Sequence, residues 1–294
     1  IITMMVSRKR AVPFVLLLCR CSSFTIGPPT KTSPQSSRLM MNAATSIPWN
    51  GATTKDDVLE GESFSKAQDD PNVGILLLNL GGPETGDDVE GFLFNLFADP
   101  DIIRLPGPLA PLQNLIALFI SKRRAPKSRA AYESIGGGSP ILKYSNAQAD
   151  LLRKSLKDRY GLDAKTYVGM RYWYPFTEEA LEKIQKDKIN ALVIIPLYPQ
   201  FSISTSGSSL RILQEEFAKH ADVYGPPNMV HTVVPAWYDR TGYVEAMANL
   251  IKTELDSFTE EEIAEAGDNV SCPRHVLFSA HGVPQSYIDA GDPY

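Results

Sequence analysis

Residues 274–284 read RHVLFSAHGVP, and they deliver one histidine to the end of an apolar strand. The unbroken apolar run at 276–278 is typical of a parallel strand that is covered on both faces, and the glycine and proline that follow end it. His281 then lies at the carboxyl end of the strand, where open α/β sheets bind their ligands. A neutral imidazole there can accept a proton or bind a metal ion. The alternative is a core or loop histidine whose hydrogen bonds go to the backbone.

Strands and helices alternate along the rest of the chain. Further strands are expected at residues 72–80, 164–170, 191–197 and 229–235. Helices are expected at residues 89–96, 146–160, 177–187, 210–220 and 240–258, and residues 202–209 read as a hydroxyl-rich loop. This alternation predicts an α/β fold with doubly wound, Rossmann-like parallel sheets. We expect a first α/β domain at 71–236 and the start of a second, incomplete one at 237–294.

Charge is distributed unevenly along the chain. Residues 1–55 contain seven Lys or Arg and no acidic residue, which leaves 22 basic against 34 acidic residues in the remainder, a net charge near −12. Such a body has no broad cationic field to meet phosphates, so no nucleic-acid partner is expected. Cys272 is the one thiol after residue 55, which excludes an internal disulfide or a cysteine-ligated cluster in that part of the sequence.

The first 70 residues read as a targeting segment and not as part of the fold. A basic cluster at 8–10 precedes an apolar run at 11–19 and small residues, the order found in a signal peptide. The stretch 24–55 is rich in Ser, Thr and Pro, as transit peptides are. The two signals together resemble the bipartite presequence of algae with complex plastids, with Phe24 after the cleavage point. A plastid is therefore expected, with the mitochondrion or a meaningless disordered tail as alternatives.

Residues 105–124, LPGPLAPLQNLIALFISKRR, combine an apolar helical face with a basic end. The apolar face consists of Leu112, Leu115, Ile116, Phe119 and Ile120. The stretch has too few apolar residues and too many prolines to span a bilayer. It is either an interfacial helix with its apolar face among lipid tails or a core helix with a solvated basic end.

Several ligand-binding patterns follow the expected strands. Arg171 begins RYWYP after the strand at 164–170, and a cation beside aromatic rings suits a flat, anionic ligand, although these rings could simply cap the core. Tyr198 and Ser202 follow the strand at 191–197, and IGGGSP at 135–140 is a glycine loop. The carboxyl ends of parallel strands share one edge of a sheet, so these groups should converge. The sequence has no phosphate-binding P-loop and no serine nucleophile elbow.

Six separated segments together resemble ferrochelatase. They are NLGGPET (79–85), KRRAPK (122–127), YESIGGGSPI (132–141), GMRYWYP (169–175), YPQFSISTSGSSL (198–210) and FSAHGVP (278–284). The resemblance extends in order over residues 72–294. It implies insertion of Fe²⁺ into protoporphyrin IX with release of two protons, and it favours the membrane-facing alternative for 105–124. Iron would be a substrate, and no cofactor is implied.

The resemblance also implies roles for individual residues. His281 matches the family's catalytic histidine, as proton acceptor or metal ligand, and the substrate-binding positions are matched by Arg124, Tyr132, Ser139, Arg171, Tyr172, Tyr198 and Ser202. Among these, Arg171 and Tyr172 match the pair that faces the histidine across the macrocycle. Ile203 stands where animal members carry a cluster-ligating cysteine, so no iron–sulfur cluster is expected.

The family continues beyond the segment that matches Tyr294, and the acidic partner of its histidine lies in that further part. We therefore expect residues 1–294 alone to lack activity. Two other functions remain open at this point, a chelatase for another tetrapyrrole and a porphyrin-binding protein without catalysis. The sequence does not indicate an oligomeric state.

Overall fold

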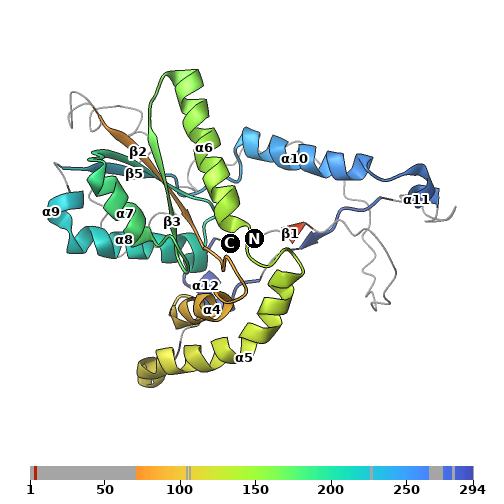
Figure 1. The fold of residues 1–294 in the computed structure, drawn as a ribbon, viewed down its shortest axis with the longest axis horizontal. Helices are drawn as coiled ribbons and strands as arrows, with labels where there is room; N and C mark the ends of the chain where they lie inside the picture. The colour runs from red at the N-terminus through yellow and green to blue at the C-terminus, as the bar shows by residue number, and fades with distance from the viewer. Residues whose placement is uncertain are drawn as a thin grey trace. The chain divides into compact units, whose positions relative to one another are not determined.

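The computed structural model describes residues 3–4, 71–103, 105, 107–225, 228–264, 274–279 and 282–293 (Figure 1). The chain separates into two compact units. The larger unit contains residues 44–237 and 292–294, and the smaller contains 1–43 and 238–291. The sequence predicts two domains, at 71–236 and 237–294, that each fold as a unit. Compactness alone does not test independent folding, so the expected domain boundary stays a prediction.

The larger unit is built on a sheet of four parallel strands. They are β2 (Val73–Asn79), β3 (Lys165–Met170), β4 (Ala191–Pro196) and β5 (Val230–Val233), in the spatial order β3-β2-β4-β5. Leu76 of β2 lies beside Tyr167 of β3 and Ile194 of β4. The four strands expected from residues 72 to 235 are thereby confirmed, as is the α/β fold with a Rossmann-like parallel sheet.

Helices cover both faces of this sheet, which makes it doubly wound. Those of the larger unit are α4 (Val89–Ala98), η1 (Gly107–Leu112), α5 (Gln113–Glu133), α6 (Ile141–Tyr160), α7 (Thr177–Lys186), η2 (Ile203–Gly207), α8 (Ser208–Lys219) and α9 (Ala221–Tyr224). Leu76 and Leu78 of β2 pack with α7 and α8, whereas Ile75 and Leu77 pack with α6. Because successive residues of a strand point to opposite faces, a strand buried on both must be apolar throughout.

A third apolar cluster joins α4 and α5 at one end of the sheet. Val89 and Phe92 of α4 pack with Ala117 and Ala125 of α5. The amide of Gln113, the first residue of α5, donates hydrogen bonds of 2.9 Å to the carbonyl oxygens of residues 97 and 103. The beginning of α5 is thus fixed to the end of α4, which positions the apolar segment 105–124.

The hydroxyl-rich segment 202–209 is helical from Ile203 on, so the expectation of a loop is wrong for all of it except Ser202. Residues Ile203–Gly207 form the π-helix η2, in which the Gly207 amide donates to the Ser202 carbonyl over 2.9 Å, and α8 continues directly from Ser208. Serine and glycine have low helix propensity, which is why the sequence suggested a loop. Tertiary packing overrides that preference here, since Ser206, Ser208 and Ser209 are all buried.

The smaller unit differs from the expected start of a second parallel sheet. Its elements are β1 (Thr3–Met4), α10 (Thr241–Asp256), α11 (Glu260–Ala264), β6 (Phe278–Ser279) and α12 (Gln285–Asp289). β6 pairs antiparallel with β1, and Leu277 and Phe278 are largely exposed, so the buried parallel strand expected at 276–278 is wrong. A buried parallel strand needs strand partners and helices over both faces, and the described residues of this unit supply only a two-residue antiparallel partner.

Candidate functional site

The carboxyl edge of the sheet gathers the segments that follow three strands. The Arg171 amide donates to the carbonyl oxygen of Asn79, at the end of β2, over 2.9 Å. The Tyr172 amide donates to the carbonyl oxygen of Leu80 over 2.9 Å, and the Leu197 amide to that of Leu78 over 2.7 Å. The expectation that these segments converge is therefore correct for the ends of β2, β3 and β4.

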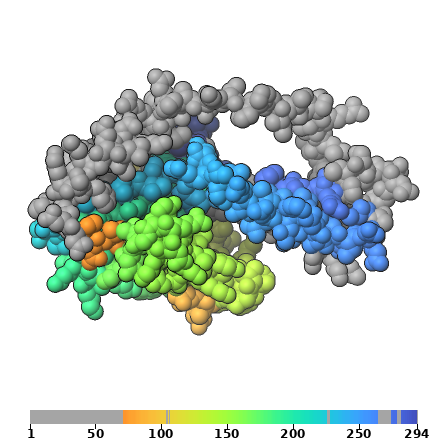
Figure 2. Space-filling model, turned by 90° about the horizontal axis from the view of Figure 1, so that it is seen from above, coloured from red at the N-terminus to blue at the C-terminus, as the bar shows by residue number. Residues whose placement is uncertain are grey.

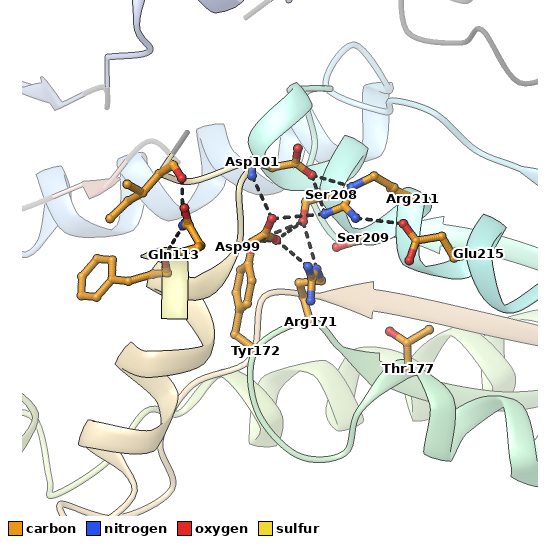
Figure 3. Close-up of polar contacts among 12 residues, drawn as sticks. Asp99, Asp101, Gln113, Arg171, Tyr172, Thr177, Ser208, Ser209, Arg211 and Glu215 are labelled. Carbon is orange, nitrogen blue, oxygen red and sulfur yellow. Dashed lines mark hydrogen bonds and ion pairs between the residues drawn. The ribbon is translucent and has the colours of Figure 1, made fainter. Parts of the chain in front are cut away.

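A buried carboxylate that the sequence reasoning missed, that of Asp99, lies at the centre of this edge (Figure 3). It accepts five hydrogen bonds, from Arg171 Nη2 (2.5 Å), Ser208 Oγ (2.7 Å), Tyr172 Oη (2.8 Å), the Asp101 amide (2.8 Å) and Arg211 Nη2 (3.1 Å). The donors come from the segment that follows β3, from α8 and from the turn after α4. We call these six residues the Asp99 cluster.

The environment of Asp99 keeps its carboxyl group ionised. Burial by itself would raise the pKa, but the Asp101 amide, the positive charge of Arg171 and the hydroxyls of Ser208 and Tyr172 together hold the pKa of Asp99 below its usual value of 3.8. The pKa of Tyr172 is raised, first by burial and then by the Asp99 charge. At neutral pH the Asp99 carboxylate therefore faces two guanidinium groups and a neutral phenol.

Arg171 is fixed at three points within this cluster. Besides its bond to Asp99, its Nε donates to Ser208 Oγ over 2.9 Å, and its Cζ lies 4.8 Å from the centre of the Tyr172 ring. Tyr172 itself is fully buried against α4 and α5. The structure therefore brings the two residues of the predicted macrocycle-facing pair together, with the phenol directed inward to Asp99.

A cavity of about 280 Å³ lies beside the cluster. Its lining comes from the ends of α4 and β3 and the starts of α7 and α8: Asn95, Ala98, Asp99, Pro100, Met170, Arg171, Phe176, Thr177, Glu178, Arg211 and Ile212. Pockets for organic ligands usually measure about 300–1,000 Å³. This cavity is therefore too small to enclose a porphyrin.

The glycine loop packs against the segment that follows β2. The amide of Ser139 donates to the carbonyl oxygen of Pro83 over 2.7 Å. A Cβ atom on Gly138 would lie 2.0 Å from the carbonyl oxygen of Glu84, and one on Gly82 would lie 2.6 Å from Ser139 Oγ. Only glycine permits this approach, so two of the six segments, GGPE and GGGSP, form one surface beside the sheet edge.

The hydroxyls of Tyr198 and Ser202 are both engaged inside the protein. Tyr198 is buried, which raises its pKa, and its Oη lies 3.4 Å from Ser209 Oγ. Ser202 is also buried and donates to Asp292 Oδ2 over 2.8 Å. The same Asp292 oxygen accepts the Ile203 amide over 2.9 Å, so this carboxylate caps the start of η2.

Arg124 and Tyr132 lie on α5, eight residues or about two turns apart. Arg124 is exposed, with its Cζ 5.6 Å from the centre of the Phe97 ring. Tyr132 is half-buried, and burial raises its pKa. Their neighbours are α4 and the glycine loop, since the Gly137 amide donates to the Tyr132 carbonyl over 2.9 Å.

His281 lies outside the described residues, so its predicted place at a strand end remains a prediction. Within the part of the chain that the structure describes, no three His, Cys, Asp or Glu side chains are grouped in a way that could hold a metal ion. The metal-binding role of His281 therefore stays a prediction.

The segment 105–124 carries an exposed apolar face. The large exposed side chains on η1 and α5 are Leu109, Leu112, Leu115, Leu118 and Phe119. Lys122, Arg123, Arg124 and Lys127 are exposed on the next turns of α5. The core-helix alternative is therefore wrong for most of this face. No helix in the described ranges has the length and apolar character that a bilayer crossing requires.

A doubly wound parallel sheet, with aromatic and charged residues gathered at its carboxyl edge, defines the larger unit as part of an open-sheet α/β protein, a class that typically binds ligands at that edge. The family model described as Ferrochelatase matches residues 72–294. The chain belongs to the ferrochelatase family.

Curated relatives agree with this membership. The chain is 57% identical over 235 residues to "Ferrochelatase-2, chloroplastic" of Arabidopsis thaliana, covering 79% of this chain and 43% of the relative. It is 52% identical over 241 residues to "Ferrochelatase-1, chloroplastic/mitochondrial" of the same plant, covering 81% and 48%. It is 55% identical over 223 residues to "Ferrochelatase" of Synechocystis sp., covering 76% and 54%. The chain thus spans about half the length of these relatives.

Proposed function

We propose that the protein of which this chain is a part inserts Fe²⁺ into protoporphyrin IX to form protohaem. The observation that carries the proposal is the family match over residues 72–294, with more than half of the aligned residues identical to proteins named ferrochelatase. The Asp99 cluster supports it, because Arg171 and Tyr172 are held at the sheet edge where such folds bind ligands. Nothing in the comparisons favours a chelatase for another tetrapyrrole.

The chemistry requires a base. Two pyrrole N–H bonds break, both electron pairs stay on nitrogen to bind the iron, and two protons leave. His281 is proposed to accept a proton or to bind the incoming iron, which a neutral imidazole can do. Both roles use the same nitrogen lone pair. No resident cofactor and no iron–sulfur cluster is proposed, and the side chain of Ile203 has no atom that could bind iron.

The porphyrin is proposed to lie along the surface formed by α5, the glycine loop and the ends of the strands. Arg124 is proposed to pair with a propionate, a role supported by its exposure on α5. Ser139 and Tyr132 are proposed to line the pocket. Tyr198 and Ser202 are buried and internally bonded, so they are proposed to support the pocket wall beneath the substrate.

Replacement of His281 tests the proposed activity. In the full-length product of the gene, His281→Ala should lower the rate of iron insertion about 10²- to 10⁴-fold, the usual contribution of a positioned acid or base. The loss of protoporphyrin fluorescence measures that rate. The matched control is His275→Ala, at an exposed position six residues earlier, which should keep the wild-type rate. Equal rates for His281→Ala and wild type would refute the assignment.

The exposed apolar face of η1 and α5 is proposed to contact a membrane peripherally. Its apolar residues would lie among lipid tails while the basic side chains that follow meet anionic headgroups. Such a surface would let an apolar porphyrin pass directly from lipid to protein. The plant relatives are named chloroplastic, in one case chloroplastic/mitochondrial, in agreement with the expected plastid address and its alternative.

A further inference from the structure

We propose that Asp99 is a positioning residue for metal insertion, whose carboxylate fixes Arg171, against the buried Tyr172 ring, in the orientation that the macrocycle meets. This inference rests on the proposed function. Asp99 does not touch the substrate in this proposal. It acts through Arg171, which the sequence resemblance places, together with Tyr172, opposite His281 across the macrocycle.

The geometry of the cluster carries the inference. Asp99 Oδ2 accepts from Arg171 (2.5 Å), Tyr172 (2.8 Å) and Ser208 (2.7 Å), so a single oxygen joins three side chains. Ser208 in turn accepts from Arg171 Nε over 2.9 Å. A planar guanidinium group that is held at Nε and at Nη2, with its face on an aromatic ring, can neither rotate nor swing away.

A purely structural role explains this arrangement less well. Burying a carboxylate costs several kcal/mol of solvation, and apolar residues of similar volume often stabilise a fold as much as a buried ion pair does. Arg211 also pairs with Asp99 and Asp101, so the carboxylate has a second cation without Arg171. The additional hydrogen bond to Arg171, which directly follows β3 at the sheet edge, is what positioning of a substrate-facing group requires.

Asp99 also links the apolar segment 105–124 to the sheet edge, because of its position in the chain. It follows directly on α4 and precedes the turn that leads to η1 and α5. The same carboxylate therefore ties the base of the apolar segment 105–124 to the end of β3. A displaced Asp99 would disturb Arg171 and the entry surface together.

The test is Asp99→Asn in the full-length product of the gene, with iron insertion into protoporphyrin as the assay. The substitution preserves shape but removes the charge and places an NH₂ group among donors. We expect kcat/KM to fall about 10- to 100-fold, since displacement of a positioning group by about 1 Å costs up to about 100-fold. The matched control is Asp150→Asn, at an exposed acid on α6 that pairs with Arg153, and it should stay within twofold of wild type.

A double variant separates positioning from a general effect on folding. If Asp99 acts through Arg171, then Arg171→Lys and Asp99→Asn with Arg171→Lys should have equal kcat/KM. Multiplied losses in the double variant would overturn the proposal. If Asp99→Asn does not fold, as judged by circular dichroism, Ser208→Ala replaces it. That variant removes the partner of Arg171 Nε without changing a charge, and an unchanged kcat/KM would overturn the proposal as well.

The outcomes also distinguish this inference from the function on which it rests. A folded wild-type protein that inserts no iron would refute the proposed function. A wild-type protein that is active, together with an Asp99→Asn variant as active as Asp150→Asn, would refute the positioning role alone.

Discussion

Truncation of two apolar side chains on α5, Leu115→Ala with Phe119→Ala, should release the protein from anionic membranes while leaving the fold intact. The two residues lie one helical turn apart and are 64% and 70% exposed. Because these side chains already face solvent, their loss removes little packing from the core. The free energy of burying their apolar surface is therefore available for contact with lipid.

The expected magnitude follows from the exposed fractions. Full burial of a leucine or phenylalanine side chain is worth about 1.5–3 kcal/mol. Scaling by the exposed fractions of Leu115 and Phe119 leaves about 1–2 kcal/mol for each, or about 2–4 kcal/mol together. At about 1.4 kcal/mol for each factor of ten, the membrane partition coefficient should fall about 30-fold to several hundred-fold.

Co-sedimentation of the full-length gene product with vesicles of phosphatidylcholine and an anionic phospholipid measures this coefficient. The matched control is Tyr144→Ala with Leu151→Ala on α6, whose side chains are 61% and 68% exposed. Figure 2 shows the outer face of α6 in green, uncovered by other described residues in that view. This variant removes similar apolar area from another face and should bind the vesicles as wild type does.

Two results would refute the reasoning. Equal binding by the α5 variant and wild type would show that this face does not meet lipid. Equal weakening by the α5 and α6 variants would show that binding follows total apolar area and not a particular surface. Binding of the wild type should also weaken as salt is raised, because each exposed basic residue near an anionic surface contributes about 1 kcal/mol that ions screen.

Three further predictions concern stability. The pKa of Asp99 is lowered in the folded state, so the Asp99 carboxylate stabilises the fold fully above its unfolded pKa of 3.8, and this stabilisation is lost as the pH falls through the folded pKa. The free energies of urea unfolding of wild type and Asp99→Asn should therefore differ above about pH 4 and converge in stronger acid. Gly138→Ala should cost about 1–3 kcal/mol of unfolding free energy, because its Cβ would meet the Glu84 carbonyl at 2.0 Å, whereas Gly107→Ala, which meets no atom within 4 Å, should be near neutral. Asp292→Ala should speed hydrogen exchange at the start of η2, where two donors lose their acceptor, and an unchanged rate would contradict its capping role.

The apolar run of β2 allowed a correct prediction, while a similar run at 276–278 did not. Both read as strands buried on two faces, because the local pattern records only that a strand could be covered. β2 has β3 and β4 on either side and helices on both faces. The described residues around β6 provide one short antiparallel partner. Whether a strand is buried depends on the strands and helices around it, and a run of three apolar residues carries no information about those neighbours.

The apolar helix at 105–124 is a second case in which the local sequence pattern does not show what covers an apolar surface. A periodic apolar face is identical in sequence whether it packs on a core or meets lipid. The sequence left both alternatives open, and only the family resemblance favoured the second. In the structure Ala117, Ser121 and Ala125 form the buried side of α5, so small residues pack on α4 and the large ones remain outside. The size of the residues on each face was the signal that could have decided the question.

Asp99 could not be recognised from its own surroundings, because its side-chain partners are distant in the chain. Arg171, Tyr172, Ser208 and Arg211 lie 72, 73, 109 and 112 residues away. A signal nevertheless existed in the charges. Arg171 was expected at the end of a buried strand, and a buried guanidinium group requires a carboxylate. Asp99 directly follows α4, a helix that packs at that edge, so it was one of the acidic residues that could have been considered as a partner of Arg171.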